Sequence, residues 1–488
     1  MLLLSFFAWL FGFGQDVALP PAPRNADFEQ VTPAGAPAGW IFDDRFKAAG
    51  FELASVAGKS GHGARLHGPA AGSGYASLYQ NVDAAPYRGK RVRFRANVKV
   101  AKPGNFVGLA LSVLRPEPKH AGFNDAMNDR PIGAGDWKSY EIVGRVAPDA
   151  VRLWIALGVS GDANVTIDDV SLEVVPNDAT PPSQEAAAYL DEAIRLIRTI
   201  HIDSAHADWD RIIADARADI GGAKVPRDTY PAIRGVLGAL GEKHSFLRPG
   251  SMQAPAPASA PAAGTPATPA LPLPTSELLE GRFALVRVPR LSPFAGGAEF
   301  GDRYQALLRT QVQALDKAPL CGWIVDLRAN TGGNMWPMMR GLDPLLGDAP
   351  FGFFAKPSGE ITSWQRRFGS VIPAADPVSA DPPAFALAHA AAPVAVLVGP
   401  DTASTGEMMA IAFAGRPASR SFGATTAGYT TGNSVHDLSD GAKLVLTGVF
   451  VRDRTGKSYD GPITPDETVG ADSAQTSAVE WLKGMCHT

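Results

Sequence analysis

The sequence predicts a multidomain protein with an all-β sandwich first, a helical segment next and an α/β domain last. Apolar and polar residues alternate over 91–100 and 151–157, between turns rich in Gly, Pro and Asp, which indicates the sandwich. Apolar residues recur at helical spacing over 187–200, which predicts a helix. Beyond residue 281, strand-like runs alternate with helix-like segments, as in a sheet with crossover helices.

The length and composition allow this organisation and exclude some functions. A chain of 488 residues has room for about three domains at ~150 residues each. Hydrophobic residues make up 45% and charged residues 19%, so sizeable cores are expected. The formal net charge of −4 gives no support for nucleic-acid binding. We place the sandwich at 20–178, the helical region at 180–250, an Ala/Pro linker at 251–276 and the α/β domain at 277–488.

The N-terminus and the two cysteines bear on localisation. Residues 1–14 are almost wholly apolar, which predicts a signal peptide over 1–19 and a periplasmic or secreted protein, although no Lys or Arg precedes the apolar run. The alternative is a buried N-terminal segment. No other stretch reaches the ~20 apolar residues of a membrane helix. Cys321 and Cys486 can pair in an exported protein, but Cys321 also fits a small buried residue.

Two strands end at loops that can build an acyl-transfer site. The strand at 323–327 runs into Gly332 and Gly333, and the strand at 394–398 leads to Ser404. Ser404 with Glu407 fits a helix capping box, which is the structural alternative to a nucleophile. At the start of a helix, however, free N–H groups stabilise negative charge. We therefore predict Ser404 as nucleophile and the N–H groups of Thr405 and of Gly332 or Gly333 as the oxyanion hole.

Several motifs together resemble the tail-specific (C-terminal processing) peptidases and the related tricorn core. Asp326 opens the strand–glycine motif over 326–333, and the segment 402–407 resembles the nucleophile motif with its acid at Glu407. The segments 426–428, 463–466 and 240–247 resemble further family motifs in the same order. The resemblance implies an α/β core of the ClpP/crotonase type that hydrolyses peptide bonds, with no cofactor and no metal.

The same resemblance indicates the remaining catalytic residues. One branch of the family uses a lysine at the position where this chain has Tyr429, so the resemblance points to the tricorn branch, whose base is a histidine. His244 occupies that position, and His436 is the rival. Asp460 aligns with the third catalytic residue, with Glu407 as the competing carboxylate and Asp326 as a supporting one.

The N-terminal sandwich resembles the jelly-roll modules often found as carbohydrate-binding domains. Trp40, Trp137 and Trp154 are either sugar-stacking platforms or core residues. Asp168 and Asp169 are either calcium ligands or acidic turn residues. A PDZ domain is not expected, because the Ala/Pro tract occupies its place in the family's domain order.

The sequence thus predicts a serine endopeptidase that acts on peptides or unfolded proteins, with a glycan as a possible partner of the sandwich and no nucleic-acid partner. A non-catalytic peptide- or glycan-binding protein with a degenerate peptidase core is the alternative from another class, and an esterase on the same site is a third reading.

Overall fold

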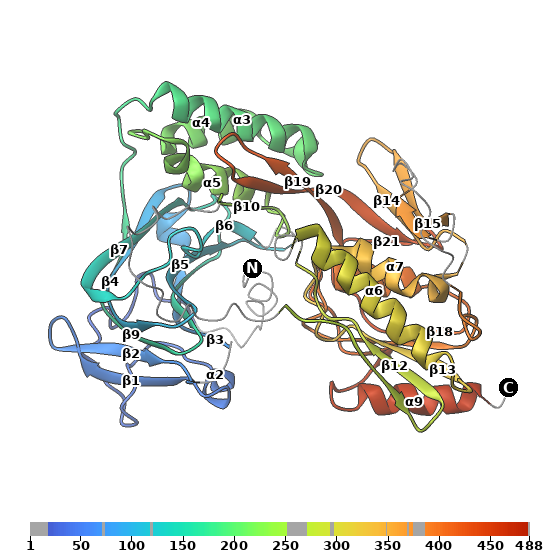
Figure 1. The fold of residues 1–488 in the computed structure, drawn as a ribbon. Helices are drawn as coiled ribbons and strands as arrows, with labels where there is room; N and C mark the ends of the chain where they lie inside the picture. The colour runs from blue at the N-terminus through green and yellow to red at the C-terminus, as the bar shows by residue number, and fades with distance from the viewer. Residues whose placement is uncertain are drawn as a thin grey trace, which may run out of the picture. The chain divides into compact units, whose positions relative to one another are not determined.

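The computed structural model describes residues 18–70, 74–117, 121–250, 271–292, 297–347, 349–367, 370–373 and 386–486. The chain forms two compact units (Figure 1). Of the described residues, the N-terminal unit holds those from 18 to 250 and from 434 to 446, and the C-terminal unit holds those from 271 to 433 and from 447 to 486. Residues 1–17 of the predicted signal peptide (1–19) and residues 251–270 of the predicted Ala/Pro linker (251–276) lie outside the described residues. Within the described ranges, no helix has the length and apolar character needed to cross a membrane.

The N-terminal unit begins with two antiparallel sheets that pack face to face. One has the order β1-β2-β9-β4-β7 and the other β3-β8-β5-β6. The core lies between them, and alternate residues of strands such as β4 and β5 pack in it, although nearly all of β5 is buried. The predicted all-β sandwich is therefore confirmed. Its strands and short helices are α2 (Asp44–Ala48), β1 (Glu52–Ala57), β2 (His62–His67), β3 (Tyr75–Asp83), η1 (Ala85–Tyr87), β4 (Arg91–Pro103), β5 (Phe106–Leu114), β6 (Ala121–Asp125), β7 (Gly135–Arg145), β8 (Arg152–Ser160) and β9 (Ala163–Val174).

Two of the three candidate sugar-stacking tryptophans are buried. Trp40 is 7% exposed and stacks on Phe28 at 4.9 Å between ring centroids, and Trp154 is 2% exposed. Trp137 is half-buried. The carboxylate of Asp168 accepts the N–H groups of Lys59 and Ser60 and so closes the β1–β2 turn. Trp40 and Trp154 therefore pack inside the unit. Asp168 lies on β9 and not in a turn, and its side chain holds the turn between two other strands.

The helical region follows the sandwich in the same unit, and a hairpin from the C-terminal half completes its core. Ser183 caps the first helix and Asp208 the second, since each side chain accepts a first-turn N–H. The apolar hairpin residues Leu438, Ala442, Leu444 and Leu446 pack against the helices. The elements are α3 (Gln184–Ile200), η2 (Ser204–His206), α4 (Trp209–Asp219), η3 (Pro226–Thr229), α5 (Tyr230–Leu240), β10 (Phe246–Arg248), β19 (Thr431–Asp437) and β20 (Lys443–Asp453).

The C-terminal unit is built on a mostly parallel sheet with the order β11-β12-β13-β17-β18-β22. Only the β11–β12 pair is antiparallel. Alternate residues of the central strands point to opposite faces, where α6, α7 and α8 cover one side and α9 the other. The elements are β11 (Thr275–Leu279), β12 (Phe283–Arg287), α6 (Gly297–Leu315), β13 (Gly322–Asp326), α7 (Met335–Leu346), β17 (Val394–Val398), α8 (Thr405–Phe413), β18 (Ser419–Gly423), β22 (Glu467–Thr468) and α9 (Ala474–Met485).

A second sheet of this unit and a disulfide complete the fold. The strands β14 (Gly352–Ala355), β15 (Ile361–Arg367) and β16 (Ser370–Pro373) pair in order, and β14 and β21 (Ser458–Tyr459) pair with the later residues of β20. Cys321, before β13, forms a disulfide with Cys486, at the end of α9, with their Cα atoms 5.4 Å apart. The predicted α/β domain is confirmed.

Candidate active site

Ser404 lies at the turn between β17 and α8. The strand is parallel to both of its neighbours, so Ser404 follows the carboxyl end of a buried parallel strand. Its φ of 51° and ψ of −115° cost a non-glycine residue about 1–3 kcal/mol. The residue is half-buried, whereas its neighbours Ala403 and Thr405 are buried. The chain thus holds one partly accessible serine in a strained conformation at the first turn of a helix.

Glu407 maintains this conformation from inside the first turn of α8. Its side chain is fully buried, and Oε2 accepts the N–H of Ser404 at 2.9 Å and the N–H of Tyr429 at 2.7 Å. Oε1 accepts the hydroxyl of Thr426 and the N–H of Gly428. Burial raises the pKa of Glu407 to about 7, although the four hydrogen bonds act in the opposite direction. Glu407 therefore joins the serine turn to the loop at 426–429, and its bond to the N–H of Ser404 is the one expected of the predicted capping box.

The glycine loop after β13 lies directly against Ser404. A Cβ atom built on Gly332 would stand 2.9 Å from Cβ and 3.3 Å from Oγ of Ser404. A Cβ on Gly333 would stand 1.7 Å from the carbonyl oxygen of Leu291. The φ angles of 104° and 126° add a second reason for glycine at both positions. Glycine is required here by close contact, at Gly332 with the Ser404 side chain and at Gly333 with the backbone of Leu291.

The two candidate glycines differ in what their N–H groups do. The N–H of Gly332 donates to Oδ1 of Asn330 at 3.0 Å. In the described part of the chain, the N–H groups of Gly333 and of Thr405 have no acceptor. The hydroxyl of Thr405 also donates to the carbonyl of Gly333 at 2.7 Å, which holds the two backbone segments together. Of the two glycines, Gly333 has the available donor.

Asp326 and Asn330 stabilise the loop itself. Asp326, at the end of β13, accepts Nε and Nη2 of Arg328 at 2.9 and 2.7 Å, while Nη1 of Arg328 donates to the carbonyl of Ala471. Asn330 is fully buried and donates to the carbonyl of Val288. Its own carbonyl accepts the N–H of Ala403, next to Ser404. Asp326 therefore braces the loop through Arg328, and Asn330 links it to the serine turn.

The loop at 426–430 contains Tyr429, the position at which the sequence resemblance led us to look for a lysine. Tyr429 is 1% exposed, and its backbone binds Glu407 as described above. The hydroxyl of Thr430 donates to the carbonyl of Gly461 at 3.0 Å. Asp460, the residue before Gly461, is exposed. This hydrogen bond between the two loops places Asp460 in the C-terminal unit beside the loop that binds Glu407.

His244 lies in the N-terminal unit, between α5 and β10. It is 3% exposed, and its N–H and that of Ser245 donate to the carboxylate of Glu242. Another histidine, His201, faces the same carboxylate at 3.8 Å, and burial lowers the pKa of His201 to about 4. The rival base His436 lies on β19, where its Nε2 is 2.7 Å from Oγ of Ser434.

The structure thus brings Ser404, Thr405, Glu407, Gly332 and Gly333 together in one unit. His244 belongs to the other unit, so its pairing with Ser404 remains a prediction. Sequence reasoning missed Asn330 and the hydroxyl of Thr426. A signal for Asn330 exists in the sequence, since a short amide before Thr-Gly-Gly is suited to bind the following N–H groups.

A serine in a strained turn at the start of a helix, beside free backbone N–H groups, is the arrangement of a serine hydrolase. Residues 283–469 match the model of peptidase family S41. The chain therefore contains an S41 peptidase domain, which is a domain of serine peptidases. The predicted resemblance to the C-terminal processing peptidases is confirmed at this level, and the predicted enzyme class with it.

Other known proteins are similar to this or to other parts of the chain. The nisin-resistance protein of Lactococcus lactis subsp. lactis is 29% identical over 316 residues, which cover 62% of this chain and 89% of that protein. A solved lipoprotein from Streptococcus agalactiae has a TM-score of 0.50 at 23% identity and covers 62% of this chain and 97% of that one, which supports the fold alone. A structure described as "CBM4 structure and function" covers 31% of this chain and 99% of that one, at 15% identity and a TM-score of 0.25.

Proposed function

We propose that this chain is an exported serine endopeptidase of the tricorn-like branch, with Ser404 as nucleophile, His244 as general base and Asp460 as the third residue. The observation that carries the proposal is the strained turn of Ser404 against Gly332, with the N–H groups of Thr405 and Gly333 available. Such preorganised donors stabilise the charge that develops on an attacked carbonyl.

The proposed reaction follows from these roles. Oγ of Ser404 bonds to the carbonyl carbon of the scissile peptide, and its proton passes to the imidazole of His244. The N–H groups of Thr405 and Gly333 bind the resulting oxyanion. The imidazolium then gives its proton to the leaving amine as the C–N bond breaks, which leaves an ester on Ser404. Water hydrolyses this ester by the same steps, with His244 again taking the proton.

Two observations support histidine as the base. The lysine position holds Tyr429, whose buried backbone belongs to the Glu407 network, so no lysine is supplied from this loop. His436, the rival, is engaged with Ser434 on its own strand. In this proposal Asp460 orients the imidazole, and Glu407 maintains the serine turn without contacting substrate.

We propose a periplasmic or extracellular location and a peptide or unfolded-protein substrate. The apolar N-terminus and the Cys321–Cys486 disulfide support export, because disulfides persist in oxidising compartments. The similarity to a nisin-resistance protein supports action on a substrate outside the cytosol. A glycan partner of the sandwich would use a surface other than Trp40 and Trp154, which are buried.

The test combines covalent labelling with turnover. The protein is treated with a fluorophosphonate probe and the modified residue is identified by mass spectrometry, while cleavage of an unfolded protein is followed in parallel. We expect the label on Ser404. Ser404→Ala is expected to lose both labelling and cleavage, and His244→Ala to slow both by about 10³-fold or more.

His436→Ala is the matched control and is expected to retain wild-type rates. A label on another residue, or full cleavage by Ser404→Ala, would contradict the nucleophile. Equal rates for His244→Ala and wild type, with loss in His436→Ala, would reverse the assignment of the base. If the wild type cleaves esters but not peptides, and Ser404→Ala loses the ester cleavage, the protein is an esterase that uses the same site.

A further inference from the structure

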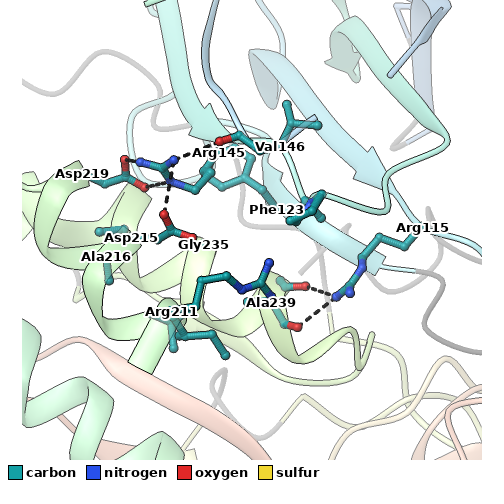
Figure 2. Close-up of a pocket in the computed structure, with 17 residues that line it drawn as sticks. Arg115, Phe123, Arg145, Val146, Arg211, Asp215, Ala216, Asp219, Gly235 and Ala239 are labelled. Atoms are coloured by element: carbon teal, nitrogen blue, oxygen red, sulfur yellow. Dashed lines mark hydrogen bonds and ion pairs between the residues drawn. The ribbon is translucent and has the colours of Figure 1, made fainter. Parts of the chain in front are cut away.

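The end of α5 is bound by a side chain from the sandwich. Arg115 directly follows β5, and its Nη1 donates to the carbonyl oxygens of Gly238 and Ala239, both at 2.9 Å (Figure 2). These carbonyls belong to the last turn of a helix, where no backbone donor follows them. A guanidinium at this point also complements the negative end of the helix dipole. The sandwich thus supplies the C-terminal cap of α5.

The Arg115 side chain is itself held in place. Its Nε and Nη2 each donate to one oxygen of Asp149 at 2.7 Å, and the side chain is 4% exposed. A planar guanidinium bound on both edges has little freedom to reorient. The helix also approaches the sandwich without side chains between them, since a Cβ on Gly238 would lie 2.4 Å from the backbone of Gly122 and Phe123. Arg115 is therefore a fixed connection between two packed elements.

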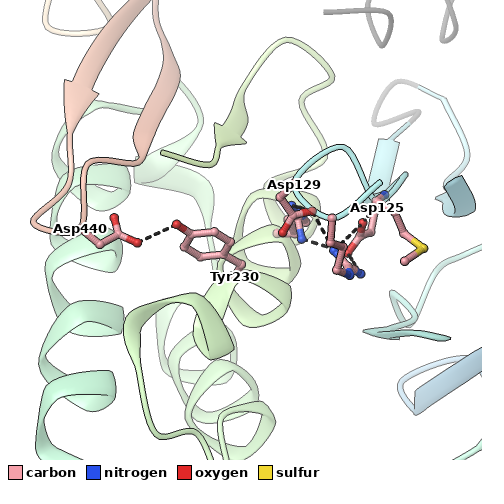
Figure 3. A network of polar contacts seen from close by, with 7 residues as sticks. Asp125, Asp129, Tyr230 and Asp440 are labelled. Carbon is pink, nitrogen blue, oxygen red and sulfur yellow. Dashed lines mark hydrogen bonds and ion pairs between the residues drawn. The ribbon is translucent and has the colours of Figure 1, made fainter. Parts of the chain in front are cut away.

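A second connection holds the middle of the same helix. Arg234 of α5 pairs with Asp125 at 2.9 Å and Asp129 at 3.4 Å, in a network that also includes Arg130 (Figure 3). Asp125 is fully buried, and Arg234 is 10% exposed. The sandwich thus fixes α5 both along its length and at its end.

The helix end leads directly to the proposed base. Gly241 ends α5 with a φ of 83°, and His244 follows three residues later. Glu242 accepts the N–H groups of His244 and Ser245, which fixes this short turn. Immediately afterwards β10 pairs with β20, with Phe246 opposite Val445. A displacement of the last turn of α5 would therefore be transmitted to His244 and not absorbed by a flexible loop.

We propose that the β-sandwich is part of the catalytic apparatus, and that Arg115 is a positioning residue that sets the location of His244 by binding the last carbonyls of α5. This inference rests on the proposed role of His244 as base. It assigns the sandwich a task in catalysis that does not depend on any glycan.

Arg145 provides a matched control. It lines the same cavity of about 50 Å³ as Arg115, at the end of β7, and its side chain is 17% exposed. It binds the carboxylate of Asp219 at 2.6 and 3.0 Å (Figure 2). Asp219 ends α4, so Arg145 joins the sandwich to a different helix. Arg145→Ala weakens the same interface without touching the end of α5.

The experiment compares Arg115→Ala, Arg115→Lys, Asp149→Asn and Arg145→Ala in the full-length protein. We measure kcat and KM on an unfolded protein substrate well below the thermal midpoint of each variant. Hydrogen exchange of the amides at 241–248 is measured on the same samples. We expect Arg115→Ala to lower kcat by about 10- to 100-fold, with KM changed less than about twofold, because a small misplacement of a catalytic group is costly.

Arg115→Lys and Asp149→Asn are expected to give smaller losses of kcat in the same direction, and they decide the matter if Arg115→Ala does not fold. Exchange at 241–248 is expected to rise in the Arg115 variants and to stay unchanged in Arg145→Ala, which also keeps kcat. Unchanged kcat and exchange in the Arg115 variants, or equal loss of kcat in Arg145→Ala, would overturn the inference.

His244→Ala separates this inference from the proposed function. If His244→Ala is inactive while the Arg115 variants keep kcat, only the positioning role fails. If His244→Ala is fully active, the proposed base is wrong, whatever the Arg115 variants do. Because hydrogen exchange does not depend on catalysis, it still shows in that case whether Arg115 holds the segment.

Discussion

The N–H of Ser404 donates to the carboxylate of Glu407 at 2.9 Å. This hydrogen bond stabilises a backbone conformation of Ser404 that is otherwise unfavourable. The same carboxylate accepts three more donors from the loop at 426–429. One buried acid thus connects the strained turn to a segment twenty residues further along the chain. The free energy that maintains the turn comes from tertiary contacts and not from the local sequence.

Glu407→Gln is expected to destabilise the protein by about 2 kcal/mol and to lower activity. Whichever way the new amide is oriented, its NH2 group faces a backbone N–H, and each unsatisfied buried donor costs about 1–3 kcal/mol. The measurement is the thermal midpoint together with labelling of Ser404. Glu360→Gln is the control, since Glu360 is 59% exposed and pairs with Lys356 on a surface turn. Equal midpoints for the two variants would contradict the role of Glu407.

Stability is expected to depend on pH through Glu407. Its pKa is about 7 when folded and near 4.5 when unfolded, so the folded state retains a proton that the unfolded state has lost between these values. This contribution to stability is complete below pH 4.5, falls as pH rises to about 7 and is lost above it, a change of about 3 kcal/mol. We expect wild type to exceed Glu407→Gln by more at pH 5 than at pH 8, as measured by urea unfolding. A difference that grows with pH would contradict the assignment.

Gly332→Ala is expected to lower activity by about 100-fold, because the new methyl group would displace Ser404 from its position. Gly359→Ala is the control that tests backbone strain without a steric clash. Gly359 has a φ of 90° in the turn between β14 and β15, and an added Cβ there meets no atom within 4 Å. That control is expected to lose about 1 kcal/mol of stability and no activity. Proteolytic rate and thermal midpoint are measured for both. Full activity of Gly332→Ala would show that Ser404 tolerates displacement.

Asp440→Asn is expected to weaken the attachment of the β19–β20 hairpin to the helical region. The hydroxyl groups of Tyr189 and Tyr230 each donate to one oxygen of Asp440 at 2.6 Å, and Figure 3 shows the contact with Tyr230. Burial raises the pKa of both phenols, so they remain donors at neutral pH. An amide accepts with only one side, so we expect a loss of about 1–2 kcal/mol. Asp437→Asn, at a largely exposed side chain on the same hairpin, is the control in thermal unfolding and is expected to change little.

The elements of the fold that the sequence predicted are those with a local signal. The strands of the sandwich and the central strands of the α/β domain show hydrophobic patterns that are visible in the sequence. Gly332, Gly333 and Ser404 follow strand ends, which turn-forming residues indicate. No local sequence pattern predicted where the hairpin at 434–446 packs. Its apolar residues complete the core of helices that precede it by some two hundred residues, and only the packed structure reveals that core.

The sequence alone therefore determined the order of the domains, the S41-like motifs and the residues around Ser404, because each depends on neighbours within a few positions. The tertiary structure decided which acceptors and donors meet. It assigned the N–H of Gly332 to Asn330 and left that of Gly333 available, gave Glu407 its four donors, and placed Arg115 at the end of α5. These contacts join residues that no local pattern relates, since burial and close backbone approach arise only when distant segments pack.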